Sequence, residues 1–362
     1  MKKSTQPIHV VHIIPTLAFG GAERFLLELT KRIPKNVVKQ TIITLWDTRP
    51  LLPELDPQVE CIVIPFDKIG YTRRISHIAK ILKDIKADIV HTHLFSADLW
   101  GRLAARRAGI PVVTTVHNVQ SYEPLLWKYI QRGMKNYSRI YTAPSRAIVE
   151  FMHTSYGIDI SRAKVILYGI DLTRFIKIPK PSFKPPYRLG MVGRIVEQKG
   201  HRFALDAMKE LSNIPCTLTI TGDGEKKAEL QAYAEKIGVA NRVEWKAPQT
   251  DVSQVYQDLD IFLMPSLWEG LGIVILEAMA SERCVIASHV DGIPEIVSPG
   301  ETGVLVPARD PHALALAVRD CIAHAKESLE RAARGRVWAQ EHAGAEHMAR
   351  EYTEMYTEIM QG

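Results

Sequence analysis

Residues 265–280 read PSLWEGLGIVILEAMA and follow directly on an apolar run typical of a buried strand. Gly270 and Gly272 leave the backbone open to a ligand. Glu269 and Glu277 are separated by seven residues. A helix that begins just after the glycines presents free N–H groups and its positive dipole end to phosphate or sugar oxygens. The segment therefore predicts the ligand-binding edge of an α/β sheet, against the alternative of an ordinary loop with two solvated glutamates.

Short apolar runs alternate with amphipathic stretches along the chain, which predicts parallel sheets built from βαβ units. The expected strands of the first half are residues 9–16, 40–45, 61–64, 89–91, 112–116 and 140–143. Those of the second half are residues 187–192, 216–221, 242–245, 261–264, 284–287 and 303–306.

Residues 179–186, PKPSFKPP, carry four prolines that oppose both helix and central strand, so we expect a linker there. The sequence thus predicts two doubly wound α/β domains, residues 1–178 and 187–362. It leaves open whether the last helix crosses back to the first domain.

Two further strings follow expected strands of the second domain. Arg194 and Lys199 stand five residues apart in VGRIVEQKG. A guanidinium fork and a mobile ammonium at this spacing suit a diphosphate, although two exposed loop cations are the alternative. Gly222, in TGDG, suits a tight turn near the base or the diphosphate.

Together these strings resemble family 4 of the retaining glycosyltransferases, whose GT-B fold has two Rossmann-like domains facing across a cleft. The resemblance covers residues 11–310. It implies that Glu269 faces the donor sugar and that Glu277 binds the nucleotide ribose. Arg194 and Lys199 would hold the leaving pyrophosphate, where cations stabilise the transition state more than the ground state. The implied donor-binding set is Gly20, Gly21, Arg194, Lys199, Gly222, Gly270, Leu271, Gly272, Ile273 and Glu277.

Two features of the first half gain meaning from the same resemblance. Gly20 and Gly21, in LAFGGAE, match the family loop that leans over the donor. His117, in TTVHN, corresponds to a family histidine that contacts the donor sugar near the reaction centre. The implied catalytic set is His117, Glu269, Arg194 and Lys199. His91 and His93 have no third metal ligand nearby in the sequence, and we interpret them as cleft-lining or structural residues.

The family needs no metal, so the resemblance implies no cofactor besides the nucleotide sugar as co-substrate. The string Asp258-Leu259-Asp260 spells the DxD of metal-dependent transferases, but it directly precedes a buried strand, and we assign it a structural or surface role. The sequence departs from the family pattern at Tyr168, where Asn is usual, at Ala247, where Gly is usual, and at residues 281–284. None of these positions belongs to the implied catalytic set, although Ala247 leaves the nucleotide preference open.

Charge is unevenly distributed, since residues 1–180 carry 27 Lys and Arg against 14 Asp and Glu. This excess favours an anionic partner such as a membrane surface or a phosphorylated lipid, and we weigh it equally against a merely soluble surface. Residues 123–139 mix aromatic and aliphatic side chains with cations, which suits a membrane surface as well as packing on the domain itself.

The scattered cysteines and the lack of a signal-peptide core predict a cytoplasmic enzyme. Peripheral association with the inner face of the cell membrane stays open.

The expected function is a retaining, hexosyltransferase-type enzyme that moves a sugar from a nucleotide-diphosphate sugar to an acceptor. A lipid-linked or envelope-polysaccharide glycan is our hypothesis for that acceptor. A nucleotide-sugar 2-epimerase and a non-catalytic nucleotide-sugar-binding protein are the alternatives. A nicotinamide dehydrogenase is disfavoured by the missing dinucleotide fingerprint, and nucleic-acid binding by the lack of an aromatic-interleaved basic motif.

Overall fold

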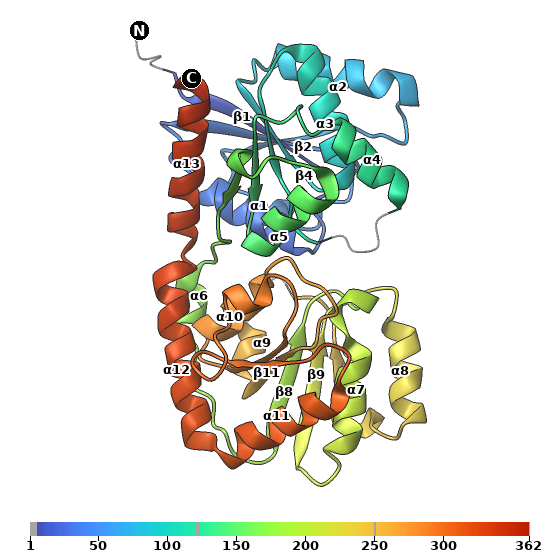
Figure 1. Cartoon of the computed structure of the whole chain (residues 1–362), viewed down its shortest axis with the longest axis vertical. Helices are drawn as coiled ribbons and strands as arrows, with labels where there is room; N and C mark the ends of the chain where they lie inside the picture. Colours follow the sequence, from blue (N-terminus) through green and yellow to red (C-terminus); the bar gives the residue numbers. More distant parts are fainter. Residues whose placement is uncertain (1–5, 120–123, 250, 362) are drawn as a thin grey trace. The chain divides into compact units, whose positions relative to one another are not determined.

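The computed structural model describes residues 6–119, 124–249 and 251–361 (Figure 1). The chain divides into two compact units. The first is Met1–Gly169 together with Ala345–Gly362, and the second is Ile170–Gly344. The C-terminal segment thus belongs to the first unit, and the second unit begins at Ile170 rather than at residue 187.

The proline-rich segment at 179–186 lies inside the second unit and does not join the two. The side chain of Arg283 donates a hydrogen bond to the carbonyl of Pro179, and the N–H of Phe183 donates to Oδ1 of Asp260 at 3.2 Å. Phe183 is buried in the core of that unit. Prolines predict irregular backbone correctly, but they do not reveal what that backbone packs against.

The first unit is built on seven parallel strands in the order β3-β2-β1-β4-β5-β6-β7. They are β1 (Ile8–Ile14), β2 (Val38–Thr44), β3 (Glu60–Val63), β4 (Ile89–His93), β5 (Val112–Thr115), β6 (Ile140–Ala143) and β7 (Ala163–Val165). The first six lie where the apolar runs predict them. β7 was missed, because three residues that are only partly buried leave no apolar run to detect.

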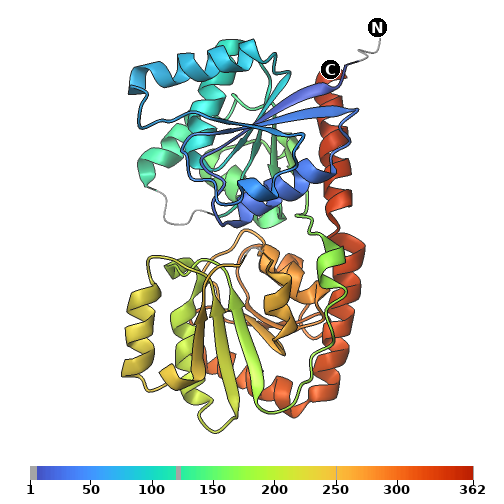
Figure 2. The same cartoon turned by 180° about the vertical axis from the view of Figure 1, so that it is seen from behind.

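Helices cover this sheet on both faces, which is why its central strands β1, β4 and β5 are almost wholly buried. They are α1 (Gly21–Arg32), α2 (Arg74–Asp84), α3 (Phe95–Ala108), α4 (Leu125–Gly133), α5 (Arg146–Phe151) and α13 (Ala345–Gln361). α13 packs beside α1, as Figures 1 and 2 show. It buries Tyr352 and Tyr356 in the first unit, although 175 residues of the other unit separate it from Gly169 in the chain.

The second unit has six parallel strands in the order β10-β9-β8-β11-β12-β13. They are β8 (Tyr187–Val192), β9 (Cys216–Thr221), β10 (Val243–Lys246), β11 (Ile261–Met264), β12 (Cys284–Ser288) and β13 (Val304–Val306). Its helices are α6 (Leu172–Phe175), α7 (His201–Glu210), α8 (Lys227–Lys236), α9 (Ser253–Gln257), α10 (Ile273–Ala280), α11 (Pro311–Ala323) and α12 (Ala325–His342).

Both sheets reverse their strand order once, between β1 and β4 in the first unit and between β8 and β11 in the second. Ligands of such sheets bind at the carboxyl ends of the strands beside this reversal. The loops after β8 and β11 are therefore where a ligand of the second unit is expected. Within the described residues, no helix has the length and apolar character that crossing a membrane requires.

Candidate active site

The loops after β8 and β11 are fastened to each other at the expected position. The N–H of Leu267 donates to the carbonyl of Gln198 at 2.8 Å, and the side-chain amide of Gln198 donates to the carbonyl of Trp268 at 3.0 Å. Gly200 has a left-handed φ of 65°, and a Cβ there would lie 1.9 Å from the carbonyl oxygen of Pro265. Only glycine lets the two loops approach this closely.

Lys199 and Glu269, one on each loop, form an ion pair between Nζ and Oε2. The side chains are 16% and 11% exposed, so water screens the pair weakly. Arg194, on the same loop as Lys199, is exposed. The structure thus brings Lys199 and Glu269 together, as a shared site requires, and leaves the guanidinium of Arg194 at the surface.

Asp291 supports Glu269 from the segment after β12. Its Oδ2 accepts a hydrogen bond from the N–H of Glu269 at 2.9 Å. Burial, and then the neighbouring charge of Glu269, raise the pKa of Asp291 above its usual value. Asp291 is the first residue of the string DGIPE. The contact gives Asp291 the task of fixing the backbone at Glu269.

Glu277 lies eight residues after Glu269, in the second turn of α10. It is 7% exposed, and its Oε2 accepts a hydrogen bond from the hydroxyl of Tyr256 at 2.7 Å. Burial, and then the Glu277 charge, raise the pKa of Tyr256 well above its usual value, so the hydroxyl stays a donor. Tyr256 was missed from the sequence, because a tyrosine on the preceding helix carries no motif of its own.

The glycines of this region differ in what they do. Gly272 is the N-cap of α10 with a φ of 90°, so it makes the left-handed entry into the helix, between the buried Leu271 and the half-buried Ile273. A Cβ on Gly222 would lie 1.9 Å from the carbonyl oxygen of Gly193. That contact between the ends of β9 and β8 explains Gly222 by packing alone. Its predicted contact with a donor stays a prediction.

Four buried polar atoms at the carboxyl edge of the second sheet have no hydrogen-bond partner in the described part of the chain. They are Thr221 Oγ1, Ser266 Oγ, Ser288 Oγ and His201 Nδ1. Buried polar groups are normally paired, so an edge with several unpaired ones is typical of a place where water or a ligand supplies the partner. This edge also carries Lys199 and Glu269.

The DxD string is structural where it is buried. Asp260 accepts hydrogen bonds from the backbone N–H groups of Phe183 and Arg188, and it pairs with the Arg188 guanidinium at 2.8 Å. Asp258 is exposed. Asp260 therefore fastens the proline-rich segment and the start of β8 to the start of β11, as its predicted structural role implies.

In the first unit, His117 follows β5 and both of its ring nitrogens have partners. Nδ1 lies 2.5 Å from the hydroxyl of Tyr168, and Nε2 lies 3.2 Å from Nδ1 of His93. Gly20 is the N-cap of α1, where a Cβ would lie 2.3 Å from a carboxylate oxygen of Glu23. Gly21 is the exposed first residue of that helix. The predicted donor contacts of His117, Gly20 and Gly21 stay predictions.

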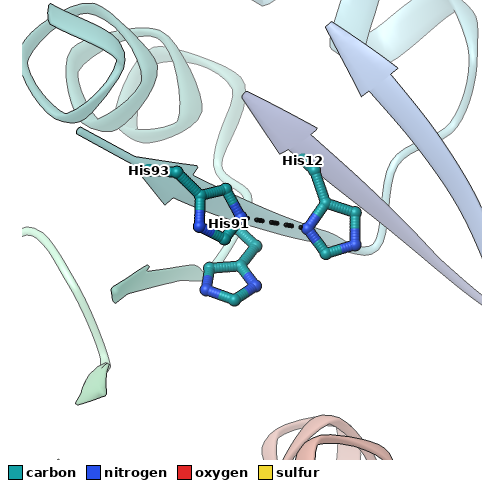
Figure 3. A group of neighbouring side chains, drawn as sticks. All are labelled: His12, His91 and His93. Carbon is teal, nitrogen blue, oxygen red and sulfur yellow. Dashed lines mark hydrogen bonds between the residues drawn. The ribbon is translucent and has the colours of Figure 1, made fainter. Parts of the chain in front are cut away.

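Three fully buried histidines gather in the first unit, as Figure 3 shows: His12 from β1, and His91 and His93 from β4. One nitrogen from each lies within 4.8 Å of the others, so His12 is the third candidate metal ligand that the sequence did not reveal. Their ring nitrogens are already hydrogen-bonded, however. His91, for example, pairs with Tyr356 and Thr115 at 2.6 Å each. Hydrogen bonding accounts for the cluster, and the predicted lack of a metal stays untested.

Known proteins resemble this chain along most of its length. Residues 19–174 match the family model for Glycosyltransferase Family 4, and residues 186–324 match that for Glycosyl transferases group 1. The chain is 31% identical over 311 residues to the alpha-maltose-1-phosphate synthase of Mycolicibacterium smegmatis, covering 75% of this chain and 79% of that protein. The chain belongs to the family 4 glycosyltransferases. It is an enzyme of that class.

Other relatives of this glycosyltransferase agree in sequence and in fold. It is 28% identical to the UDP-Gal:alpha-D-GlcNAc-diphosphoundecaprenol alpha-1,3-galactosyltransferase of Escherichia coli, over 86% of this chain and 87% of that enzyme. Anabaena Alr3699/HepE in complex with UDP-glucose superposes with a TM-score of 0.87 at 20% identity, over 97% of this chain and 100% of that chain. The predicted GT-B fold of two Rossmann-like domains is confirmed.

Proposed function

We propose that this glycosyltransferase transfers a sugar from a nucleotide-diphosphate sugar with retention of the anomeric configuration. The observation that carries the proposal is the largely buried Lys199–Glu269 pair at the carboxyl edge of the second sheet, where a diphosphate and its sugar would bind. The structures of Anabaena Alr3699/HepE with UDP and with UDP-glucose support a nucleotide-sugar donor.

Each residue of this edge has a chemical task in the proposed reaction. Lys199 and the exposed Arg194 stabilise the negative charge that grows on the leaving diphosphate. Lys199 exchanges Glu269 for phosphate oxygens when the donor binds, which frees the Glu269 carboxylate to accept hydrogen bonds from sugar hydroxyls. Glu277, held by Tyr256, accepts hydrogen bonds from the ribose diol. A donor phosphate oxygen takes the acceptor proton, so no side chain of the enzyme acts as a general base.

Incubation with a panel of nucleotide sugars tests this proposal. The correct donor should raise the Tm, because a ligand that binds the native state stabilises it by mass action, and it should be slowly hydrolysed. Transfer to an acceptor with retained configuration supports the proposal. An isomerised donor without any acceptor would identify a 2-epimerase. Binding of a donor with neither transfer nor hydrolysis would identify a non-catalytic binding protein.

We further propose that the acceptor is a lipid-linked glycan at an anionic membrane surface. Helix α4 carries three exposed apolar side chains, Leu125, Leu126 and Tyr129, at 70%, 67% and 67% exposure. Lys128 and the exposed Arg132 lie on the same helix. Apolar side chains beside cations are typical of helices that lie on anionic lipid. The name of the Escherichia coli relative includes a diphosphoundecaprenol-linked sugar, which supports the proposal of a lipid-linked acceptor.

Liposome flotation tests the membrane proposal. The wild type should float with vesicles that contain anionic lipid, and the triple variant Leu125→Ser, Leu126→Ser, Tyr129→Ser should stay in the soluble fraction. Leu316→Ser is the matched control, since Leu316 is a 51% exposed leucine on α11. Failure of the wild type to float, or equal flotation of the triple variant, would refute the proposal.

A further inference from the structure

Five hydrogen bonds follow one another through the first unit, from Tyr168 to the backbone of α1. We call this series the histidine chain. Its steps are Tyr168 Oη to His117 Nδ1 (2.5 Å), His117 Nε2 to His93 Nδ1 (3.2 Å), His93 Nε2 to His12 Nδ1 (3.2 Å), His12 Nε2 to Gln40 Oε1 (3.2 Å), and Gln40 Nε2 to the Thr30 carbonyl (3.2 Å). The dashed line in Figure 3 is the step between His93 and His12.

The end of the histidine chain at Gln40 and Thr30 determines which atom donates in each of its hydrogen bonds. The Thr30 carbonyl can only accept, so the amide NH₂ of Gln40 must face it. The amide oxygen of Gln40 then faces His12 and can only accept, so His12 carries its proton on Nε2. A neutral imidazole has one donor and one acceptor nitrogen, which leaves Nδ1 of His12 as the acceptor.

The protonated nitrogens of His93 and His117 follow from that of His12. His93 must donate from Nε2 to His12, so its Nδ1 accepts from His117. His117 is therefore protonated at Nε2 and accepts at Nδ1 from the hydroxyl of Tyr168. An imidazolium at His12 or His93 would turn two N–H donors toward each other unless the neighbouring histidine changed its tautomer, and one at His117 would require the hydroxyl of Tyr168 to accept instead of donate. Burial acts in the same sense, because it lowers the pKa of His12 to about 4 and that of His117 to about 3.

Packing holds the reactive end of the histidine chain in place. The ring of Phe25 lies 5.3 Å from that of His117 and 5.0 Å from that of Tyr168, centroid to centroid. Tyr168 is 5% exposed, so its hydroxyl has little access to water. The tyrosine stands where the family usually has asparagine. An aromatic hydroxyl that reaches Nδ1 is thus a feature of this chain.

We propose that Tyr168 is a positioning residue that holds His117 as a neutral imidazole, protonated at Nε2, for glycosyl transfer. The proposal rests on the proposed function and on the predicted contact of His117 with the donor sugar. Cleavage of a glycosidic bond builds positive charge on the sugar in an oxocarbenium-like transition state. A neutral imidazole tolerates that charge, whereas an imidazolium would repel it.

Nitrogen NMR of the wild type tests the histidine chain without any substrate. In ¹⁵N-histidine-labelled protein at neutral pH, His12, His93 and His117 should each show a protonated Nε2 and an unprotonated Nδ1. A protonated Nδ1 in any of the three would overturn the proposal, and this measurement needs no variant to fold.

Tyr168→Phe then tests the positioning role. The Nδ1 signal of His117 should lose its hydrogen-bond shift, and kcat should fall about fivefold to tenfold with little change in the donor KM, because one hydrogen bond to the catalytic residue is lost. Tyr352→Phe is the control. Tyr352 is a buried tyrosine of the same unit, and its hydroxyl donates a hydrogen bond to Thr142, which is not part of the histidine chain. Unchanged His117 signals in Tyr168→Phe would overturn the proposal. Changed signals with an unchanged kcat would instead refute the proposed role of His117 at the donor sugar.

Discussion

At the scale of single residues, the ion pair of Lys199 and Glu269 gives the sharpest expectation. Lys199→Ala should lower the transfer rate by about 10²–10³, because it removes a cation aimed at the developing diphosphate charge. Glu269→Ala should act in the same range by releasing the sugar. Activity with the correct donor and acceptor measures both effects. Lys209→Ala, which removes an exposed lysine from α7, is the control and should leave the rate unchanged.

Circular dichroism and the Tm show whether these variants stay folded. Full activity in folded Lys199→Ala would contradict the assigned role of the lysine.

The sequence predicted Lys199 and Glu269 as site residues because each lies in a short motif, and the residues of such a motif are neighbours in the sequence. It could not predict the contacts of Tyr256, Asp291 and His12, whose partners lie 21, 22 and 81 positions away in the chain. Contacts of that kind exist only once the strands have been ordered into a sheet.

At the scale of elements, the junction of the loops after β8 and β11 depends on Gly200. Gly200→Ala should lower the free energy of unfolding by about 2–4 kcal/mol, since a left-handed φ costs about 1–2 kcal/mol and the contact with the Pro265 carbonyl adds a clash. Gly238→Ala is a matched control. Its φ of 77° is also left-handed, but nothing lies within 4 Å of the added Cβ. Urea unfolding of both variants measures the difference, and equal losses would show that the close approach is unimportant.

The strands were predictable at this scale because apolar runs flanked by glycine and polar residues mark a sheet buried on both faces. The packing of the proline-rich segment at 179–186 was not predictable, because proline excludes helix and central strand but does not determine which residues the segment contacts. The buried side chain of Arg283, bonded to the carbonyl of Pro179, supplies that neighbour. The packing of α13 on the first unit was not predictable for the same reason. It depends on the contacts of Tyr352 with Thr142 and of Tyr356 with His91, which are far away in the sequence.

At the scale of the whole molecule, the two units differ in how many buried histidines they hold neutral. The first unit contains His12, His91, His93 and His117, whose pKa values burial lowers well below 6.5. The second contains His201, whose pKa burial lowers to about 4. Unfolded histidine binds its proton near the ordinary value of 6.5. As the pH falls below that value, the unfolded chain takes up protons that the folded chain refuses, so stability is lost.

Acid should therefore weaken the first unit more than the second. Each such histidine contributes a loss of about 1.4 kcal/mol per pH unit between its unfolded and folded pKa values, and the first unit has more of them. In the second unit the raised pKa of Asp291 works in the opposite direction, because a carboxyl that holds its proton in the folded state gains stability as the pH falls. Hydrogen exchange of the intact protein at pH 7 and pH 5, corrected for intrinsic rates, should show β1 and β4 losing several kcal/mol more protection than β8 and β11. His12→Gln should reduce that loss, and equal losses in the two sheets would mean that the histidines of the first unit are not held neutral.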